Sequence, residues 1–328
     1  MPTNLPPGYF DAEKRYRAAE STAEKIVCLE ELMSTIPKHK GTDHLRADLR
    51  RQLSKLKAEK KSSKRPSKHQ SAFRVVKEGA GQVAVIGPAN AGKSSLVATL
   101  TNASPEVSEA PFTTWRPTPG MMLVKNIQVQ LVDTPPLDRD YVESELFDLI
   151  RRADLILLVV DLLTYPVEQL KNTFAILDEH NIAPLHLKEQ YTDERYMSFI
   201  PLLVVANKCD DKSCDGVFDI FGELLEEEWP LLPVSVTNER NLDDLKQSVF
   251  EQLEIIRVYS KIPGEEPDLG EPFVFKKGST VADMAAKVHK DFYENLKSAR
   301  VWGSSAFDGQ MVQKDYILQE GDVVELRI

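Results

Sequence analysis

The residues best suited to chemistry form one uninterrupted stretch, which follows the apolar run Val83–Ile86. The stretch is Gly87-Pro88-Ala89-Asn90-Ala91-Gly92-Lys93-Ser94, and Ser95 comes directly after it. Its pattern, G-x-x-x-x-G-K-[ST], is that of a loop whose backbone N–H groups bind phosphate, helped by the N-terminus of the next helix. Lys93 is predicted to reach the β- and γ-phosphates and to stabilise charge there, and Ser94 to bind Mg²⁺. These nine residues therefore predict the phosphate site of a nucleotide-binding protein.

A second pattern completes the predicted metal site. The apolar segment 127–132 ends at Asp133, within the sequence Asp-Thr-Pro-Pro. In a phosphate-loop nucleotidase, an aspartate at the end of such a strand reaches the Mg²⁺ shell. We therefore expect Asp133 to lie beside Ser94.

A third pattern predicts the base that is bound. The apolar segment 201–206 is followed by Asn207-Lys208-Cys209-Asp210, which has the form N-K-x-D. A carboxylate can accept hydrogen bonds from guanine N1–H and the 2-amino group, whereas adenine offers no such pair. Asp210 is therefore predicted to select guanine, and so GTP or GDP. The order of the segments places Ser235 and Val236, at the end of the strand 231–235, where a backbone N–H would contact the guanine O6.

These residues require a sheet that brings the strand ends together. Apolar runs at 83–86, 127–132, 155–160, 201–206 and 231–235 predict buried, mostly parallel strands, and 167–179 predicts a helix. Segments 121–124 and 127–132 flank Lys125-Asn126, which predicts a two-residue hairpin and one antiparallel strand. The predicted class is α/β, with the nucleotide at one edge of the sheet.

The remaining segments predict two flanking domains. Residues 1–70 are predicted to form a helical hairpin (11–36 and 43–59) with a basic linker, residues 71–254 the nucleotide-binding domain, and residues 255–328 a small mixed sheet. In the last segment, strands are expected at 255–259, 272–275, 301–302 and 323–328. A helix over 280–296, with Thr280 as N-cap and Asp283 three residues later, completes a ββαββ order. Nothing in this segment points to catalysis.

Charge is distributed unevenly along the 328 residues. The net charge is −10, but residues 38–68 hold twelve Lys and Arg against three acidic residues. A basic segment on an acidic chain favours a polyanionic partner such as RNA, although a solvated linker has the same composition. No apolar run is long enough to cross a bilayer, and three cysteines without a C-x-x-C pair favour a reducing cytoplasm over a disulfide framework. Neither membrane binding nor sequence-specific DNA binding is expected.

The set G-P-A-N-A-G-K-S, P-F-T-T, D-T-P, N-K-C-D and V-S resembles the Obg family of GTPases, in its developmentally regulated GTP-binding (DRG-like) branch, and the last segment resembles a TGS domain. The resemblance implies a cytoplasmic, ribosome- or RNA-associated switch. It also implies that Thr114 is the switch I threonine that binds Mg²⁺ and contributes to catalysis, with Thr113 as the alternative. Asn90 lies where potassium-stimulated relatives use an asparagine to hold K⁺ beside the phosphates; it could equally cap the loop alone.

The chain departs from the family pattern after Asp133. D-x-x-G switches carry a glycine whose N–H binds the γ-phosphate, and here that position is Pro136. Proline has no N–H and a fixed φ, so the segment is expected to respond weakly to the γ-phosphate. Leu137 stands where Ras-like proteins carry a catalytic glutamine. The predicted activity is therefore slow hydrolysis of GTP to GDP and phosphate, with two alternatives: a GTP-dependent binding module with little hydrolysis, or a nucleotide-independent RNA adaptor.

Overall fold

The computed structural model describes residues 75–101, 116–139, 142–305 and 307–328, together with scattered residues before residue 52. The chain divides into two compact units, Met1–Ser71 and Ala72–Ile328, and the second unit contains the three sheets described below. The predicted helical hairpin and basic segment lie almost wholly outside the described residues. Thr113 and Thr114 lie entirely outside them.

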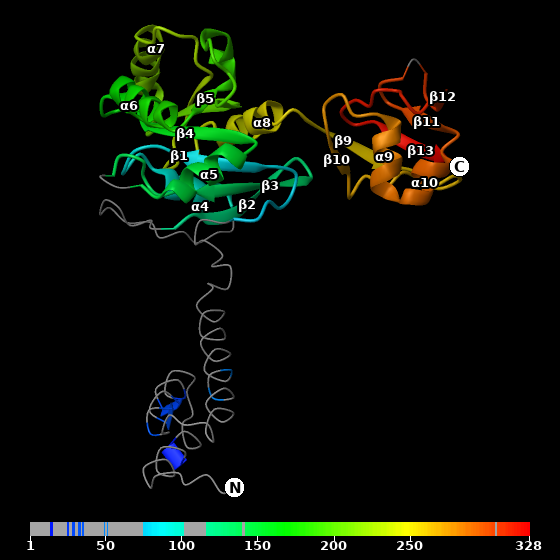
Figure 1. The fold of residues 1–328 in the computed structure, drawn as a ribbon. Helices are drawn as coiled ribbons and strands as arrows, with labels where there is room; N and C mark the ends of the chain where they lie inside the picture. Colours follow the sequence, from blue (N-terminus) through cyan, green and yellow to red (C-terminus); the bar gives the residue numbers. More distant parts are fainter. Residues whose placement is uncertain are drawn as a thin grey trace, which may run out of the picture. The chain divides into compact units, whose positions relative to one another are not determined.

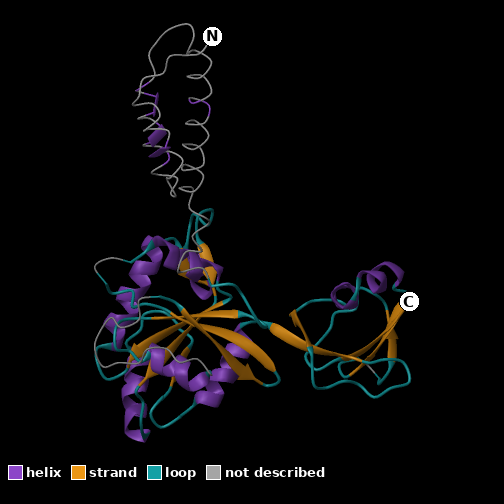
Figure 2. Ribbon diagram, turned by 90° about the horizontal axis from the view of Figure 1, so that it is seen from below, coloured by secondary structure: helices purple, strands orange, loops and turns teal. Residues whose placement is uncertain are grey.

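A six-stranded sheet carries the nucleotide-binding motifs (Figures 1 and 2). Its strands lie in the order β2-β3-β1-β4-β7-β8. Their bounds are β1 Gln82–Ile86, β2 Thr118–Val124, β3 Ile127–Asp133, β4 Leu155–Asp161, β7 Leu202–Asn207 and β8 Leu231–Pro233. The strands β1, β3, β4, β7 and β8 are parallel, so their carboxyl ends meet at one edge. The expected α/β class is confirmed.

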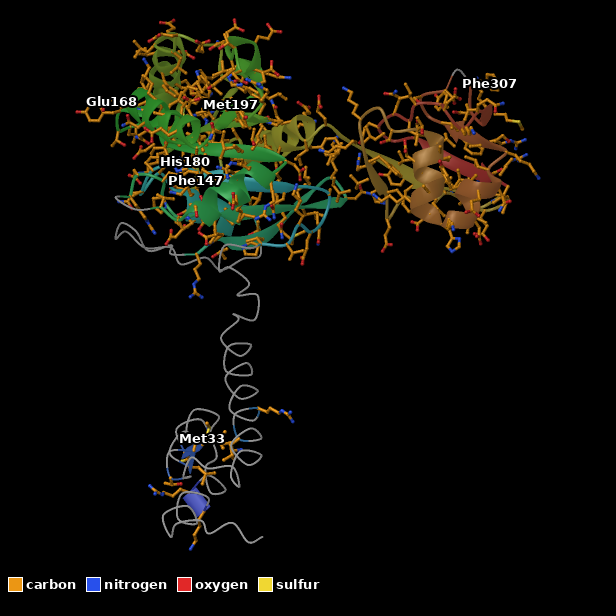
Figure 3. All side chains as sticks on the ribbon, in the orientation of Figure 1. Met33, Phe147, Glu168, His180, Met197 and Phe307 are labelled. Carbon is orange, nitrogen blue, oxygen red and sulfur yellow. The ribbon has the colours of Figure 1, made fainter. Side chains whose placement is uncertain are left out.

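Helices cover both faces of this sheet, which explains why its central strands are apolar throughout. One core cluster packs α4 (Lys93–Leu100) and α8 (Leu242–Gln252) against the sheet. The other packs α5 (Ser144–Arg152), α6 (Pro166–Glu179) and α7 (Asp215–Glu223). In the second layer the rings of Phe147 and His180 are stacked at 3.5 Å between centroids (Figure 3), which joins α5 to the end of α6.

The predicted hairpin is confirmed. β2 pairs antiparallel with β3, and the turn is Lys125-Asn126, where Lys125 adopts a left-handed φ of 53°. Positive φ is what a two-residue hairpin turn requires. The strand that reaches Asp133 is therefore held on one side by β2 and on the other by β1.

Several elements of this domain were not predicted, among them the helices α5, α7 and α8, two short strands and a 3₁₀ helix, and one predicted strand is shorter. β5 (Ile182–Pro184) and β6 (Ser198–Ile200) form a separate two-stranded sheet around the 3₁₀ helix Leu185–Gln190. Three-residue strands are too short to show a periodicity. The strand expected at 231–235 ends at Pro233, so Ser235 lies beyond the ladder and instead bridges Arg240.

The C-terminal segment forms a five-stranded sheet in the order β10-β9-β13-β11-β12. The bounds are β9 Ile255–Ser260, β10 Phe273–Lys276, β11 Ser298–Trp302, β12 Gln310–Val312 and β13 Val323–Arg327. β12 was not predicted; it is a three-residue strand at the edge of the sheet, paired with β11. The sheet is mixed, because β13 pairs parallel with β9.

The helix expected over 280–296 is two helices. α9 (Val281–Val288) begins at Thr280, whose side chain and Asp283 form the predicted capping box. The backbone is extended at His289, and α10 (Lys290–Asn295) follows. His289 Nδ1 accepts a hydrogen bond from the Asp291 N–H at 3.2 Å, so this histidine caps the second helix. Its role in the fold is thus structural.

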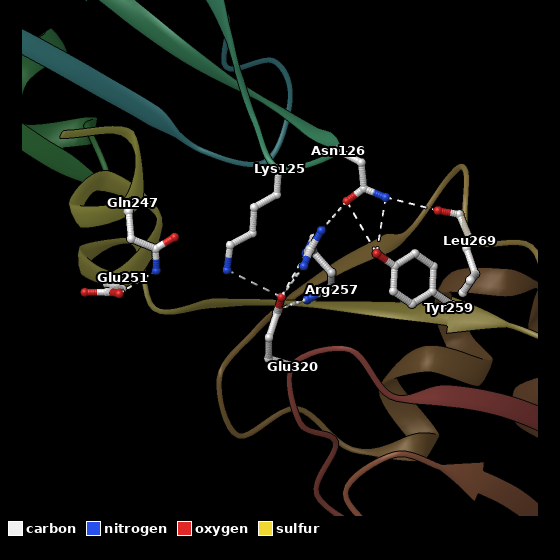
Figure 4. A network of polar contacts seen from close by, with 8 residues as sticks. All are labelled: Lys125, Asn126, Gln247, Glu251, Arg257, Tyr259, Leu269 and Glu320. Carbon is white, nitrogen blue, oxygen red and sulfur yellow. Dashed lines mark hydrogen bonds and ion pairs between the residues drawn. The ribbon is translucent and has the colours of Figure 1, made fainter. Parts of the chain in front are cut away.

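The two sheets meet at the β2–β3 turn (Figure 4). Asn126 Oδ1 accepts a hydrogen bond from the Arg257 guanidinium, and Asn126 Nδ2 donates to the hydroxyl of Tyr259 at 3.2 Å. Lys125 Nζ lies 3.8 Å from Glu320 Oε1 and 3.8 Å from the centroid of the Phe250 ring. The turn at one end of β3 is therefore bonded directly to the C-terminal sheet.

Candidate functional site

The phosphate loop connects β1 to α4 with a backbone that demands its glycines. Gly87 has φ 140° and Gly92 has φ 95°. A Cβ at Gly87 would lie 2.2 Å from the Val159 carbonyl oxygen, and one at Gly92 would lie 2.2 Å from Asn207 Nδ2. Asn90 has φ 60°, a left-handed conformation that asparagine tolerates better than most residues. Both glycines are needed for this turn, which precedes the helix N-terminus.

Lys93 is buried at the start of α4, with 5% of its surface exposed. Its Nζ donates to the Pro88 carbonyl oxygen at 2.7 Å, so the side chain lies back across the loop. Burial lowers its pKa from 10.5 to about 8, although the nearby Asp133 and Asp138 carboxylates act in the opposite direction. Burial removes water from the Lys93 ammonium and so disfavours its charge. A bound anion would compensate for the lost hydration, so we expect this ammonium to bind phosphate strongly.

Ser94 and Asp133 are brought together at the edge of the sheet. The Ser94 hydroxyl donates to Asp133 Oδ2 at 2.6 Å, and Asp133 is fully buried at the end of β3. Thr134 fixes the chain just beyond, because its hydroxyl donates to the Val85 carbonyl oxygen at 2.8 Å. A hydroxyl and a carboxylate are oxygen ligands that suit Mg²⁺, so the residues present fit the expected ion.

The segment after Asp133 folds over the phosphate loop. Pro135 and Pro136 are buried, and Leu137 is 2% exposed and packs in the core. The Leu137 N–H points to the Gly87 carbonyl oxygen at 3.5 Å. Asp138 then accepts from the Ala89 N–H at 3.1 and 3.2 Å, one distance to each carboxylate oxygen. A carboxylate thus lies against the loop that is predicted to bind phosphate.

The N-K-x-D residues lie at the carboxyl end of β7. Asn207 Nδ2 donates to the Ala91 carbonyl oxygen at 2.9 Å, which ties this strand to the phosphate loop. Lys208 has φ 68°, and its Nζ lies 2.6 Å from Asp161 Oδ2 at the end of β4. The two motifs, which lie far apart in the sequence, therefore form one continuous site.

Asp210 is exposed, and two residues of the loop after β8 hold it in place. Its Oδ1 accepts from the Ser235 hydroxyl at 2.6 Å, and its peptide carbonyl accepts from Asn238 Nδ2 at 2.8 Å. The Ser235 N–H donates to the Arg240 carbonyl oxygen at 3.2 Å. Because that donor is engaged, Val236 is the better candidate for a backbone contact with the base.

Three residues of this site were not predicted from the sequence: Asp138, Asp161 and Asn238. Asp161 could have been found, since it directly follows the buried run 155–160 and so lies at the same edge as Asp133 and Asn207. Asp138 and Asn238 lie in loops, and their contacts depend on how those loops fold back.

Comparisons with known proteins show the family and the fold. Residues 82–208 match the model of a family described as 50S ribosome-binding GTPase, and residues 256–328 match the TGS domain. A solved GTP-binding protein from Pyrococcus horikoshii shares the fold at a TM-score of 0.53 and 18% identity, over 75% of this chain and 99% of that chain. Within the described residues, no helix is long and apolar enough to span a bilayer.

The similarity to curated proteins extends over nearly the whole chain. The GTP-binding protein MJ1326 of Methanocaldococcus jannaschii is 32% identical, over 93% of this chain and 92% of its own. The developmentally-regulated GTP-binding protein 1 of Xenopus laevis is 26% identical, over 93% and 98%. Ribosome-interacting GTPase 1 of Saccharomyces cerevisiae is 25% identical, over 93% and 99%. The chain therefore belongs to the Obg-family GTPases, in the developmentally regulated GTP-binding branch that carries a C-terminal TGS domain.

Proposed function

We propose that this GTPase hydrolyses GTP slowly to GDP and phosphate with Mg²⁺, and that it acts as a switch on the ribosome or another RNA in the cytoplasm. The observation that carries the proposal is the contact between Ser94 and Asp133 beside the buried Lys93. Lys93 and the loop N–H groups stabilise charge on the transferred phosphoryl group, and water is the nucleophile. Mg²⁺, when bound, neutralises charge on the β- and γ-phosphates. Thr114 is proposed to contribute from switch I.

Slow hydrolysis is expected because an apolar side chain stands where Ras-like proteins orient the attacking water. Leu137 occupies the position of that glutamine, and its side chain lies in the core. A single-turnover assay with and without ribosomes tests the proposal. Hydrolysis that ribosomes accelerate supports a switch, whereas nucleotide binding without hydrolysis favours the binding-module alternative. An affinity for ribosomes that is the same with GTP, with GDP and without nucleotide would identify an RNA adaptor.

The ribosome is proposed as the partner for two reasons. One relative, matched over 93% of this chain and 99% of its own, is named Ribosome-interacting GTPase 1, and the matched family is described as 50S ribosome-binding GTPase. The basic segment 38–68 adds twelve positive side chains that could contact phosphates.

We expect binding to ribosomes to depend steeply on salt. Replacing Lys60, Lys61, Lys64, Arg65 and Lys68 by Gln should lower the slope of log affinity against log salt by about four, since each phosphate contact contributes roughly 0.7 to 0.9. Sedimentation with ribosomes over a salt series measures this slope. An unchanged slope would move the contacts elsewhere, most simply to the TGS domain.

We also expect K⁺ to accelerate hydrolysis through Asn90. An ion between the β- and γ-phosphates stabilises developing charge, so K⁺ should raise the rate at least about tenfold over Na⁺ at equal ionic strength. Asn90→Gly keeps the left-handed backbone while removing the side chain, and it should abolish the difference. Equal rates in both salts, or a K⁺ effect that survives in Asn90→Gly, would contradict this role and leave Asn90 as a capping residue.

A further inference from the structure

The segment that replaces the D-x-x-G switch ends in a negative charge placed on the phosphate loop. Both oxygens of Asp138 lie within hydrogen-bond distance of the Ala89 N–H, at 3.1 and 3.2 Å. Loop N–H groups of this kind bind the phosphates of a nucleotide. The carboxylate therefore occupies a donor that an incoming anion would use.

Asp138 lies at the γ-phosphate end of the site. It follows by two residues the position whose N–H binds the γ-phosphate in a D-x-x-G switch, here Pro136. Its negative charge is also felt by Lys93, and it raises the pKa of that ammonium, which is predicted to reach the β- and γ-phosphates. GDP, which lacks the γ-phosphate, would leave most of this region unoccupied.

The backbone before Asp138 holds it in place. Pro135 and Pro136 are buried and restrict φ, and Leu137 anchors the segment in the core. Asp138 itself is exposed, so it can leave the loop without disturbing packing. The segment thus combines a buried anchor at Leu137 with an exposed, charged contact at Asp138.

We propose that Asp138 determines the preference between GDP and GTP by competing with the γ-phosphate for the Ala89 N–H. This inference rests on the proposed nucleotide binding. In a D-x-x-G switch the γ-phosphate attracts the segment through a glycine N–H. Here two anions meet at one donor, so the γ-phosphate repels the Asp138 carboxylate and releases it from the Ala89 N–H. A ligand shifts a conformation only through contacts that differ between states, and this repulsion is such a contact. The sequence alone predicted a weak response; the geometry points to an inverted one.

Nucleotide affinity provides the first test. The probes are GDP and a non-hydrolysable GTP analogue with Mg²⁺, measured on the full chain, on Asp138→Asn and on Asp138→Ala. Removing the charge should strengthen binding of the analogue about tenfold, because one like-charge contact with the γ-phosphate is lost. Binding of GDP should change less than about twofold. Asp243→Asn, which neutralises a side chain 95% exposed on α8, is the matched control and should change neither affinity.

Equal effects on GDP and the analogue, or none on either, would overturn the inference while leaving nucleotide binding intact. Failure of the unaltered chain to bind either nucleotide would overturn the proposed function instead. Both Asp138 variants are expected to fold like the unaltered chain, because the side chain is exposed.

Hydrogen exchange provides the second test. A peptide covering residues 137–145 should take up deuterium faster with the GTP analogue than with GDP, and Asp138→Asn should remove the difference. Slower uptake with the analogue, as a D-x-x-G switch gives, would show that the γ-phosphate attracts this segment and would overturn the inference.

Discussion

Replacing Asp210 by Asn should change the nucleotide preference from guanine to xanthine. The carboxylate accepts hydrogen bonds from guanine N1–H and the 2-amino group, whereas an amide places a donor against one of these donors. Xanthine carries an oxygen in place of the amino group and so restores the pair. Sites built on such pairing discriminate by roughly 10⁴-fold, and the ratio of guanine to xanthine affinity should fall by about that factor.

Two contacts on the protein side of residue 210 make this substitution a specific test of the contact with the base. The Ser235 hydroxyl and Asn238 Nδ2 hold residue 210 from the protein side, so the substitution alters the face presented to the base without moving the backbone. Competition between GDP and its xanthine analogue for a fluorescent nucleotide gives the ratio. Asp211→Asn, at the neighbouring exposed carboxylate, is the matched control and should keep the preference for guanine. Equal binding of ATP and GTP by the unaltered protein would contradict the assignment of the base.

Replacing Lys93 by Met should weaken nucleotide binding and stabilise the nucleotide-free protein at the same time. A hydrogen bond to a charged group contributes about 1.5–3 kcal/mol, so affinity for GDP should fall by on the order of a hundredfold. The gain in stability follows from the pKa of Lys93, which burial lowers from 10.5 to about 8. That shift corresponds to about 3 kcal/mol by which folding disfavours the ammonium form.

The sign of the effect gives a pH signature. Because the folded-state pKa is lower than the unfolded one, the cost is fully present below pH 8 and disappears as pH rises towards 10.5. Lys93→Met should therefore raise the free energy of unfolding by about 1–3 kcal/mol at pH 7, with a smaller gain at pH 9.5. Denaturant unfolding without nucleotide measures both. Lys171→Met removes an exposed lysine that pairs with Glu226, and it should change stability by less than about 0.5 kcal/mol. A loss of stability in Lys93→Met at pH 7 would show that the buried ammonium does not destabilise the fold.

Much of this fold could be predicted because its signals are contiguous. The phosphate loop, the Asp-Thr-Pro-Pro segment and N-K-x-D each follow a buried strand. Parallel strands place their carboxyl ends at one edge, so the meeting of Ser94 with Asp133 followed from strand order. The bond from Asn207 to the phosphate loop was not predicted, although it lies at the same edge. The antiparallel strand was equally predictable, since a two-residue connection permits no other pairing.

The residues that were missed depend on contacts with no local signal. The approach of Asp138 to Ala89 is set by how two prolines and a buried leucine direct the chain, which no periodicity records. The break at His289 falls inside an apolar helical pattern, where a side-chain cap competes with helix continuation. Ser235 was predicted, with Val236, to offer a backbone N–H to the base, but the engagement of the Ser235 N–H by Arg240 arises only once the loop is folded.

The strand β3 has a mechanical consequence. Its seven residues run from Ile127 to Asp133 and span roughly 20 Å. Asp133 lies at the proposed Mg²⁺ site, and Asn126, immediately before the other end, is bonded to Arg257 and Tyr259 of the TGS sheet. A strand hydrogen-bonded on both sides hardly stretches, so it behaves as a stiff rod between the two places. A displacement of Asp133 along the strand would therefore be transmitted to the turn at Asn126, which contacts the TGS sheet.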